Sequence, residues 1–548
     1  MIIDATNFFQ NSPKHKAIFE TLLSSNSNNF TNFLESLSLK FTDDASLNIW
    51  LLSTLSERTI HNPLYKYFCF IKVIEELYVK NSAYCFLIDE YWLKRYFIQC
   101  MPEIKMVYRS RKNPIKLFFI VRLKLAYYFF LKIAQIFIAK FCIQKIHFKN
   151  TEITLIERFA LPNFYAKDRY FTGIEEHAPR NINLVFCPSL VHTNIRGSFS
   201  AFKEMEKSIT VFLFKEHYLL VRDIIYSFYS SLSLKKIIKR NNSLNELERI
   251  LLLGSYKKII SFSSSIEAFI NYQFINRIKN LNVSKFINWW EGQLVDRGFA
   301  LGIKSLKKQI VLRHYLGFIP KANDFQVHPT NFECNYNLCS KEFYLLGTIY
   351  KQSFKLYNSE LKIHTAPAFR FSQVHTLNIQ DSKKLDASKA LVGLPMDESE
   401  SIEILNCIQG SLKSQHARII KLYVKFHPAS KSKLIKESTL FNKFFIDTNS
   451  SIYDQNFSIF ISGSSSLVFE AALTGSIVFV YEKDFKNTYL QRYFDQLPNV
   501  FIFSSSDELL SLLDQSDNLI NLIGTELDIL KPKFFSKSSK LLTNKILS

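Results

Sequence analysis

The chain of 548 residues has no long hydrophobic run that is free of charge. None approaches the roughly 20 apolar residues that a bilayer-spanning helix needs. The start, Met1–Thr6, shows no basic segment followed by an apolar core, so a secretory signal is not expected. Helix-turn-helix, zinc-finger and RNA-binding signatures are also missing, which argues against a nucleic-acid-binding protein.

Cysteine is sparse and its spacing is irregular. Most of the eight cysteines stand in apolar runs, which favours buried free thiols in a reducing compartment. Cys334 and Cys339 lie near His328, but their spacing fits no usual zinc pattern, and no metal site is predicted there.

What the chain has in excess is positive charge and aromatic side chains. The formal net charge is +21, and there are 52 Phe and 26 Tyr. Such a charge predicts an anionic partner: membrane lipid, a phosphorylated or acidic glycan, a nucleotide or nucleic acid. An AT-rich genome would produce part of the same bias.

The most informative stretch is Ile419–Tyr481. It begins with an apolar strand that closes at Lys425–Pro428, and a second strand leads into the hydroxyl-rich turn Ser462–Ser466. A helix follows, with Gly475 as its stop, and then a third strand. This alternation predicts an open parallel sheet whose ligand lies beyond the carboxyl ends of the strands.

Two interpretations of these strand ends stay open. A serine-rich turn at a helix start offers free N–H groups and a positive dipole end, which suit a phosphate, and His427 would add a donor or a charge. Alternatively, the serines only cap the helix, and His427-Pro428 only stops the strand.

The N-terminal half shows the same alternation. After a polar extension over residues 1–45, we predict a strand at Leu47–Ser53, a helix at Pro63–Lys80, a strand at Ala83–Ile88 and a helix at Tyr91–Gln99. Further on, the strand pattern continues at Thr151–Arg158, Asn181–Cys187, Ile209–Phe214, Phe286–Trp290, Ile310–Tyr315 and Glu342–Leu346. Ser243 and Glu246 fit a capping box.

A basic, aromatic-rich insertion at 110–147 interrupts this pattern. One interpretation is a helical hairpin lying in an anionic membrane interface. The other is a buried helical insertion whose lysines reach solvent along their own stems. Its cations do not fall on one clean helical face, which counts against a simple amphipathic helix.

Two strand ends in this half carry candidate chemistry. The loop after Asn181–Cys187 holds His192 and Arg196, which would touch an anionic acceptor or simply be solvated. Glu291 follows an apolar strand and precedes Gly292 and a helix starting at Leu294. At that position a carboxylate can take a proton from an attacking hydroxyl, or else cap the helix.

Three motifs in this order, Trp290–Gly292, Lys425–Pro428 and Ser464–Ser466, resemble the motif set of bacterial sialyltransferases and polysialyltransferases. The chain is similar, more broadly, to surface-carbohydrate biosynthesis proteins of O-antigen clusters. The resemblance implies an α/β GT-B fold, with two doubly wound Rossmann-like domains facing across a cleft. These are an acceptor-side domain at 46–375, carrying the helical insertion, and a nucleotide-sugar-binding domain at 388–525, followed by a tail at 526–548.

The resemblance also implies roles for individual residues. Glu291 would deprotonate the acceptor, although Trp290 stands where the family has a second acid. His427 would contact the phosphate of CMP. The implied donor-side residues are His427, Pro428, Gly463, Ser464, Ser465, Ser466, Glu470 and Gly393; the acceptor-side candidates are His192, Arg196, Gln293, His314 and Arg370.

The implied activity is inverting transfer of a sialic-acid-like or Kdo-type sugar from a CMP donor to a surface glycan or glycolipid such as lipopolysaccharide or capsule. No metal or other cofactor is expected, since no Asp-x-Asp pair follows a predicted strand. The expected location is the cytoplasm, peripherally on the inner face of the membrane. The alternative is a teichoic-acid-type glycerophosphate or ribitol-phosphate transferase with a CDP-linked donor, which would use His314 as its second histidine. A third possibility is a non-catalytic membrane- or nucleic-acid-binding protein.

Overall fold

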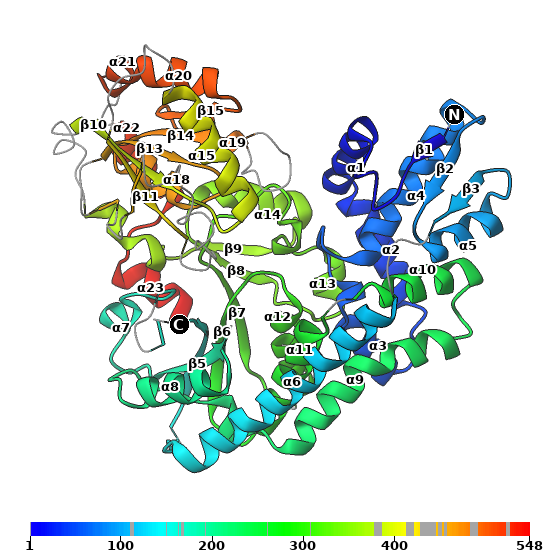
Figure 1. Ribbon diagram of the computed structural model, residues 1–548. Helices are drawn as coiled ribbons and strands as arrows, with labels where there is room; N and C mark the ends of the chain where they lie inside the picture. The colour runs from blue at the N-terminus through cyan, green and yellow to red at the C-terminus, as the bar shows by residue number, and fades with distance from the viewer. Residues whose placement is uncertain are drawn as a thin grey trace.

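A computed structural model gives the fold of the chain (Figure 1). The residues that it describes are 2–109, 114–148, 151–162, 164–165, 169–191, 193–259, 261–306, 308–376, 386–412, 421–427, 445–447, 452–453, 457–482, 491–521 and 526–548.

The C-terminal half forms a six-stranded parallel sheet in the order β12-β11-β10-β13-β14-β15. Its strands are β10 (Asp386–Gly393), β11 (Lys421–Lys425), β12 (Phe445–Asp447), β13 (Phe457–Ser462), β14 (Ile477–Tyr481) and β15 (Val500–Phe503). The chain starts in the middle, moves outward to one edge and then returns to fill the other side, which is the doubly wound order. In register, Gly393 pairs with both Lys425 and Ser462, so three strands end at the same level.

The N-terminal half contains a second parallel sheet, β5-β4-β6-β7-β8-β9, wound in the same sense. Its strands are β4 (Ile153–Ala160), β5 (Leu184–Leu190), β6 (Val283–Trp289), β7 (Val311–Leu316), β8 (Glu342–Leu345) and β9 (Lys362–Thr365). The segment Ile209–Phe214, predicted as a strand, forms only one parallel bridge, between Phe212 and Phe186. The order reverses between β4 and β6, where a ligand crevice is expected.

The first residues of the chain are part of the folded structure. β1 (Ile2–Asp4) pairs with β2 (Cys85–Ile88), which pairs with β3 (Lys105–Tyr108), forming a separate three-stranded parallel sheet. The sequence pattern predicted that the strand at Ala83–Ile88 belongs to the sheet of the larger N-terminal domain. That assignment is wrong, because this strand is β2 of the small sheet. The extension predicted at 1–45 supplies β1 and two helices, α1 (Pro13–Ser25) and α2 (Ser27–Ser38), to this part of the molecule.

The predicted strand at Leu47–Ser53 is wrong as well. The segment belongs to helix α3 (Asp44–Leu51), whose start is capped by the Asp43 carboxylate accepting from the amide of Ser46 at 2.8 Å. A short apolar run does not by itself distinguish a strand from a buried helix. Here the Asp43 cap stabilises the helix. The capping box predicted at Ser243 also shifts: Asn245 and Glu248 cap α10 (Glu246–Lys257).

Several further helices form where the sequence predicts them: α4 (Pro63–Lys80), α5 (Tyr91–Cys100), α9 (Val221–Arg240), α12 (Leu294–Ser305), α15 (Glu398–Leu412), α18 (Leu467–Leu473) and α20 (Ser506–Asp514). Helix α11 (Ser263–Arg277) was not predicted. Of the linker predicted at Asp381–Ser388, residues 381–385 lie outside the described part of the chain, and residues 386–388 are the first three of β10.

The two large sheets face each other, and the chain returns to the first domain at its end. Helix α22 (Glu526–Phe534) packs on α18, and α23 (Lys540–Leu547) reaches α7 (Ile174–His177) of the N-terminal domain (Figure 1). Arg313 on β7 donates to the carbonyl of Ile546 at 2.9 Å. The fold is thus GT-B, as predicted, and its last helix ties the C-terminus to the N-terminal sheet.

The basic insertion is one long helix, α6 (Pro114–Cys142). Its segment Phe119–Cys142 is long and apolar enough, by length and composition, to cross a membrane. However, one face packs on the body of the protein: Leu131, Ile136 and Ala139 are buried. Gln135 donates to the hydroxyl of Ser198 on α8 (Ile195–Glu206) at 2.9 Å, so α6 lies along the domain.

Candidate functional site

A cavity of about 900 Å³ lies at the strand-order reversal of the N-terminal sheet. Residues after β4, β5 and β6 line it together with the inner faces of α6 and α11, while Met396 and His427 enter from the C-terminal domain. Glu291, Gln293, Arg370 and His427 therefore share one cavity. Because the carboxyl ends of parallel strands meet at one edge, these residues converge from distant parts of the chain.

The carboxylate of Glu291 is held in a defined position. One oxygen accepts from the indole N–H of Trp289 at 3.0 Å, and the other accepts from the side-chain amide of Gln293 at 2.6 Å. Burial raises the pKa of Glu291, an effect opposed by the Trp289 hydrogen bond and by Arg370 and supported by Asp324. A carboxylate with a raised pKa is a better proton acceptor than an exposed one, as a general base requires.

The turn that presents Glu291 requires glycine at position 292. Gly292 has a φ of +69°, and a Cβ atom there would lie 2.0 Å from the carbonyl oxygen of Gln326. Asp296, in the first turn of α12, accepts from the amides of Glu291 and Gln293 at 3.1 and 3.0 Å. Asp296 therefore completes a capping box with the N-cap residue Gln293, and the Glu291 side chain faces the cavity.

A further buried carboxyl, that of Glu157 on β4, stands behind this turn. It accepts from the backbone amide of Trp289 at 3.3 Å. The pKa of Glu157 is raised to about 7. Burial is the main cause and the charge of Glu291 adds to it, while the hydrogen bond from Ser189 and the charge of Lys215 oppose it. Glu157 belongs to the support of the site, and no motif in the sequence indicated it.

Trp290, at the position where the resembling family carries an acid, is a core residue. It is 1% exposed, and its indole donates to the carbonyl of Val327 at 2.8 Å. Trp290 follows the last residue of β6, and its ring packs in the core against His314 and Phe343. A single carboxylate at this strand end is what the structure presents.

Cationic side chains surround His427. Burial, together with the charges of Arg169, Arg370 and Lys321, lowers the pKa of His427 to about 4. The pKa of Arg169 is lowered, first by burial and second by the positive charge of Arg370, so the two guanidinium groups lie near each other. Within the described part of the chain, no carboxylate lies at ion-pair distance from either guanidinium. Guanidinium groups in a cavity suit an anionic ligand, and the carboxylates of Glu470 and Glu291 act on these two from beyond ion-pair distance.

Arg370 was among the sequence candidates, whereas Arg169 and Lys321 were missed. Both missed residues stand in loops, after β4 and after β7 respectively, and neither belongs to a motif or to a strand end. Only the path of those loops brings them to His427.

We expect a bound phosphate to raise the pKa of His427 from about 4 toward its ordinary value of 6.5, because the anion offsets the surrounding cations. NMR titration of ¹³C-labelled histidine, assigned with His427→Gln, measures this with and without CMP. A pKa that stays near 4 at saturating CMP contradicts the prediction. In the empty protein the lowered pKa disfavours the protonated folded state, so stability falls as the pH decreases from 6.5 to about 4.

The serine-rich turn after β13 is occupied by a side chain of the protein itself. Glu400, on α15, accepts from the amide of Ser464 at 2.7 Å and from its hydroxyl at 2.5 Å. A Cβ atom on Gly463 would lie 2.2 Å from the same carboxylate. Ser464–Ser466 do not line the cavity, so phosphate contact by Ser464 requires Glu400 to turn away.

The other donor-side candidates lie near this edge of the C-terminal sheet. Glu470 is 9% exposed and accepts from the hydroxyl of Tyr453 at 2.5 Å. Burial raises its pKa, while Tyr453, Arg370 and Arg169 lower it, which places Glu470 close to the cations around His427. Gly393 ends β10, where its carbonyl accepts from the hydroxyl of Ser462 at 2.5 Å.

The remaining candidates separate. Pro428 and His192 lie outside the described residues. Arg196 is exposed on α8 and does not line the cavity. His314 is fully buried: one ring nitrogen contacts the Asn288 side chain, and the other accepts from the amide of Ser340 at 2.8 Å. The geometry therefore gives His314 a structural role in the core and not that of a second catalytic histidine.

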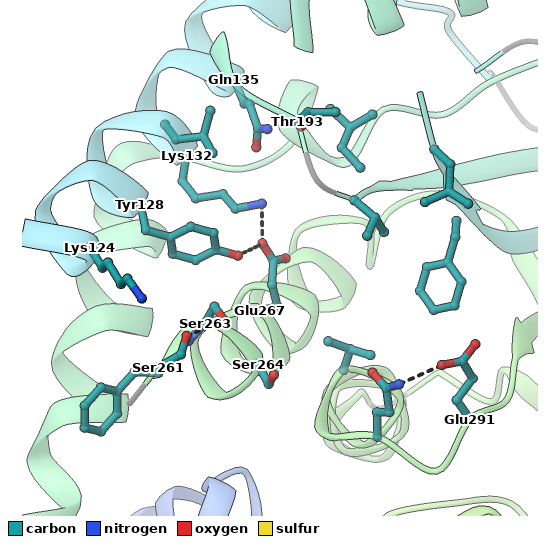
Figure 2. Close-up of a pocket in the computed structure, with 18 of the residues that line it drawn as sticks. Lys124, Tyr128, Lys132, Gln135, Thr193, Ser261, Ser263, Ser264, Glu267 and Glu291 are labelled. Carbon is teal, nitrogen blue, oxygen red and sulfur yellow. Dashed lines mark hydrogen bonds and ion pairs between the residues drawn. The ribbon is translucent and has the colours of Figure 1, made fainter. Parts of the chain in front are cut away.

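The opposite wall of the cavity is built by α6 and α11. Figure 2 shows Lys132 and Tyr128 of α6 bonded to Glu267 of α11, with Lys124 and the serines at the start of α11 nearby. Lys215 adds a second cation, 3.5 Å from Glu267. Burial raises the pKa of Glu267, but the two lysines outweigh it and hold the pKa at about 2. This charged network fixes α6 against the domain.

No protein-family model and no curated protein matches the chain. Among solved structures, it is similar to the wall teichoic acid polymerase TagF (11% identity, 72% of this chain and 87% of that one, TM-score 0.37). It is also similar to UDP-GlcNAc 2-epimerase from Neisseria meningitidis (11%, 72% and 98%, TM-score 0.39) and to the glycotransferase of kitacinnamycin (8%, 72% and 100%, TM-score 0.40). Because these scores are low, the fold assignment above is made from the sheets of this chain.

Proposed function

We propose that the protein is an inverting glycosyltransferase that moves a sialic-acid-like or Kdo-type sugar from a CMP donor to a hydroxyl of a surface glycan or glycolipid. One observation carries this proposal: Glu291 of one domain and His427 of the other line the same cavity, together with Arg370 and Arg169. In this proposal Glu291 serves the acceptor. Arg169 and Arg370, although they belong to the N-terminal domain, join His427 at the donor phosphate, so the acceptor-side role predicted for Arg370 is replaced.

In the proposed reaction, the carboxylate of Glu291 takes the proton of the acceptor hydroxyl. The acceptor oxygen forms a bond to the anomeric carbon while the bond from that carbon to the CMP phosphate oxygen breaks. The electron pair leaves with the phosphate, whose growing negative charge is stabilised by Arg169, Arg370 and the imidazole of His427. Trp289 and Gln293 orient the base through the two hydrogen bonds described above.

The amount of positive charge favours a sugar that is itself acidic. Two guanidinium groups line the cavity together with His427, one for each anionic group of such a donor. A nonulosonate or Kdo-type sugar brings a carboxylate in addition to the CMP phosphate, and guanidinium groups bind both kinds of anion. The burial of His314 weighs against the glycerophosphate or ribitol-phosphate alternative, which relies on a second histidine.

A thermal-shift panel with CMP, CDP, UDP and GDP tests the proposal. CMP at about 100 times its dissociation constant would stabilise the protein by about 2.7 kcal/mol, visible as a melting-temperature increase of about 2 °C or more. We expect the double variant Arg169→Gln/Arg370→Gln to lose this increase.

The matched control is Arg180→Gln/Arg240→Gln, which removes two exposed arginines outside the cavity and should keep the response to CMP. A panel in which no cytidine nucleotide raises the melting temperature, or in which both double variants respond like the wild type, would remove the basis of the proposal.

A further inference from the structure

Helix α6 exposes a continuous apolar stripe on the side away from the protein body. Its members are separated by one, three, four or seven positions: Phe119, Ile120, Leu123, Tyr127, Phe130, Phe137 and Phe141. Tyr127, at the edge of the stripe, also lines the cavity. Such spacing puts them on one helical face. Leu123, Phe130 and Phe141 are 70%, 64% and 78% exposed, which is unusual for large hydrophobic side chains on a soluble surface.

Helix α9 continues this surface. It exposes Ile225, Tyr226, Tyr229 and Leu232, again at helical spacing. The two helices touch through the rings of Phe129 and Phe228, whose centroids are 5.1 Å apart. They run antiparallel, because His217, just before α9, contacts the carbonyl of Ala139 near the end of α6 at 2.7 Å. Each residue of a helix is rotated by about 100° from the one before it. Measured from the Phe129–Phe228 contact, this rotation places the apolar stripes of α6 and α9 on the same side of the helix pair.

Every exposed charge described on these two helices is positive. Arg122 and Lys140 are exposed beside the stripe of α6, Lys124 is exposed but also lines the cavity, and α9 exposes Arg222, Lys235, Lys236, Lys239 and Arg240. The sequence of α6 contains no acidic residue, and the one acid of α9, Asp223, is buried and paired with Arg277 at 2.6 Å. An apolar stripe bordered by long cationic side chains matches the boundary between lipid tails and anionic headgroups.

We propose that this α6–α9 face docks the protein on an anionic lipid bilayer. The helices lie in the plane of the interface and do not cross it, because the inner face of α6 is tied to the domain by Lys132–Glu267 and Gln135–Ser198. Figure 1 shows α6 and α9 side by side along one edge of the N-terminal half. This inference goes beyond the proposed chemistry by naming the surface that would contact lipid.

Docking would also determine the side from which the acceptor reaches Glu291, a consequence that rests on the proposed function. The inner face of α6 lines the cavity through Tyr128, Lys132 and Gln135, while its outer face carries the stripe. One helix therefore separates the lipid-facing surface from the space that leads to Glu291. An acceptor anchored in the bilayer would reach the base along this wall of the cavity.

Co-sedimentation with vesicles of phosphatidylcholine, with and without phosphatidylglycerol, tests the docking. We expect the wild type to pellet with the anionic vesicles, to stay in solution with the neutral ones, and to be released by high salt. Leu123→Ser/Phe130→Ser/Tyr229→Ser should weaken binding about tenfold or more, because three inserted side chains are lost. Hydrogen exchange should slow in α6 and α9 when the vesicles are added.

The matched control is Val79→Ser/Leu356→Ser/Ile529→Ser, which removes three equally exposed hydrophobic side chains from α4, α14 (Lys351–Tyr357) and α22. It should bind like the wild type. Three results would overturn the docking: no pelleting with anionic vesicles, equal losses in both triple variants, or a dimer in solution that the face variant abolishes. Since nucleotide binding is measured without vesicles, failure here is distinct from failure of the proposed chemistry.

Discussion

Glu291→Gln is expected to lower turnover by about 10²–10⁴-fold while leaving the affinity for CMP within about twofold of the wild type, because the amide keeps the shape of the side chain but cannot accept a proton. The carbonyl oxygen of the introduced amide can still accept the hydrogen bond from Trp289, so the turn that carries it should persist. Initial rates with the donor sugar, together with CMP titration, measure the two effects separately.

The control for this variant is Glu526→Gln, which makes the same chemical change on an exposed side chain of α22 and should leave turnover unchanged. If Glu291→Gln retains most of its turnover, then the base is elsewhere and the proposed mechanism is wrong. Equal losses of turnover and CMP affinity would instead show that residue 291 supports the shape of the site.

The pH profile gives a second test of the same residue. Because burial raises the pKa of Glu291, the base becomes protonated at a higher pH than an ordinary glutamate, whose value is 4.5. Activity should therefore fall, as the pH decreases, through a pKa above 4.5.

Glu333→Ala is expected to cost about 3–5 kcal/mol of stability, because it removes the carboxylate that two buried arginines share. The carboxylate lies 3.2 Å from Arg58 and 3.5 Å from Arg297, and all three side chains are at most 3% exposed. Burial raises the pKa of Glu333, but the two arginines outweigh it, so that the pKa is lowered and the charge is kept. Denaturant unfolding measures the loss.

The site of this change joins separate parts of the N-terminal half. Arg58 also donates to the hydroxyl of Thr31 at 2.9 Å and to the carbonyl of His328 at 2.9 Å. The control is Glu360→Ala, whose partner Lys341 is 53% exposed, and which should cost less than about 1 kcal/mol. Similar losses in the two variants would contradict a special role for the buried network.

Much of the fold could be predicted from the sequence, because strands of a parallel sheet are buried on both faces and appear as apolar runs. The runs at Phe457–Ile461 and Ile477–Tyr481, and the candidate residues that follow the strands, are local features. Errors arose where local signals compete. At Leu47–Ser53 a cap on Asp43 favoured a helix, and the Ala83–Ile88 strand was assigned to the wrong sheet because pairing is not local.

The sequence by itself determined the alternation of strands and helices and the positions of Glu291 and His427 at strand ends, since both depend on neighbouring residues. Only the tertiary structure decided that these two residues share a cavity, that Arg169 and Lys321 join His427, and that Glu400 occupies the serine-rich turn. It also decided that the apolar stripes of α6 and α9 turn outward together. Each of these depends on contacts between segments far apart in the chain, which hydrophobic periodicity does not encode.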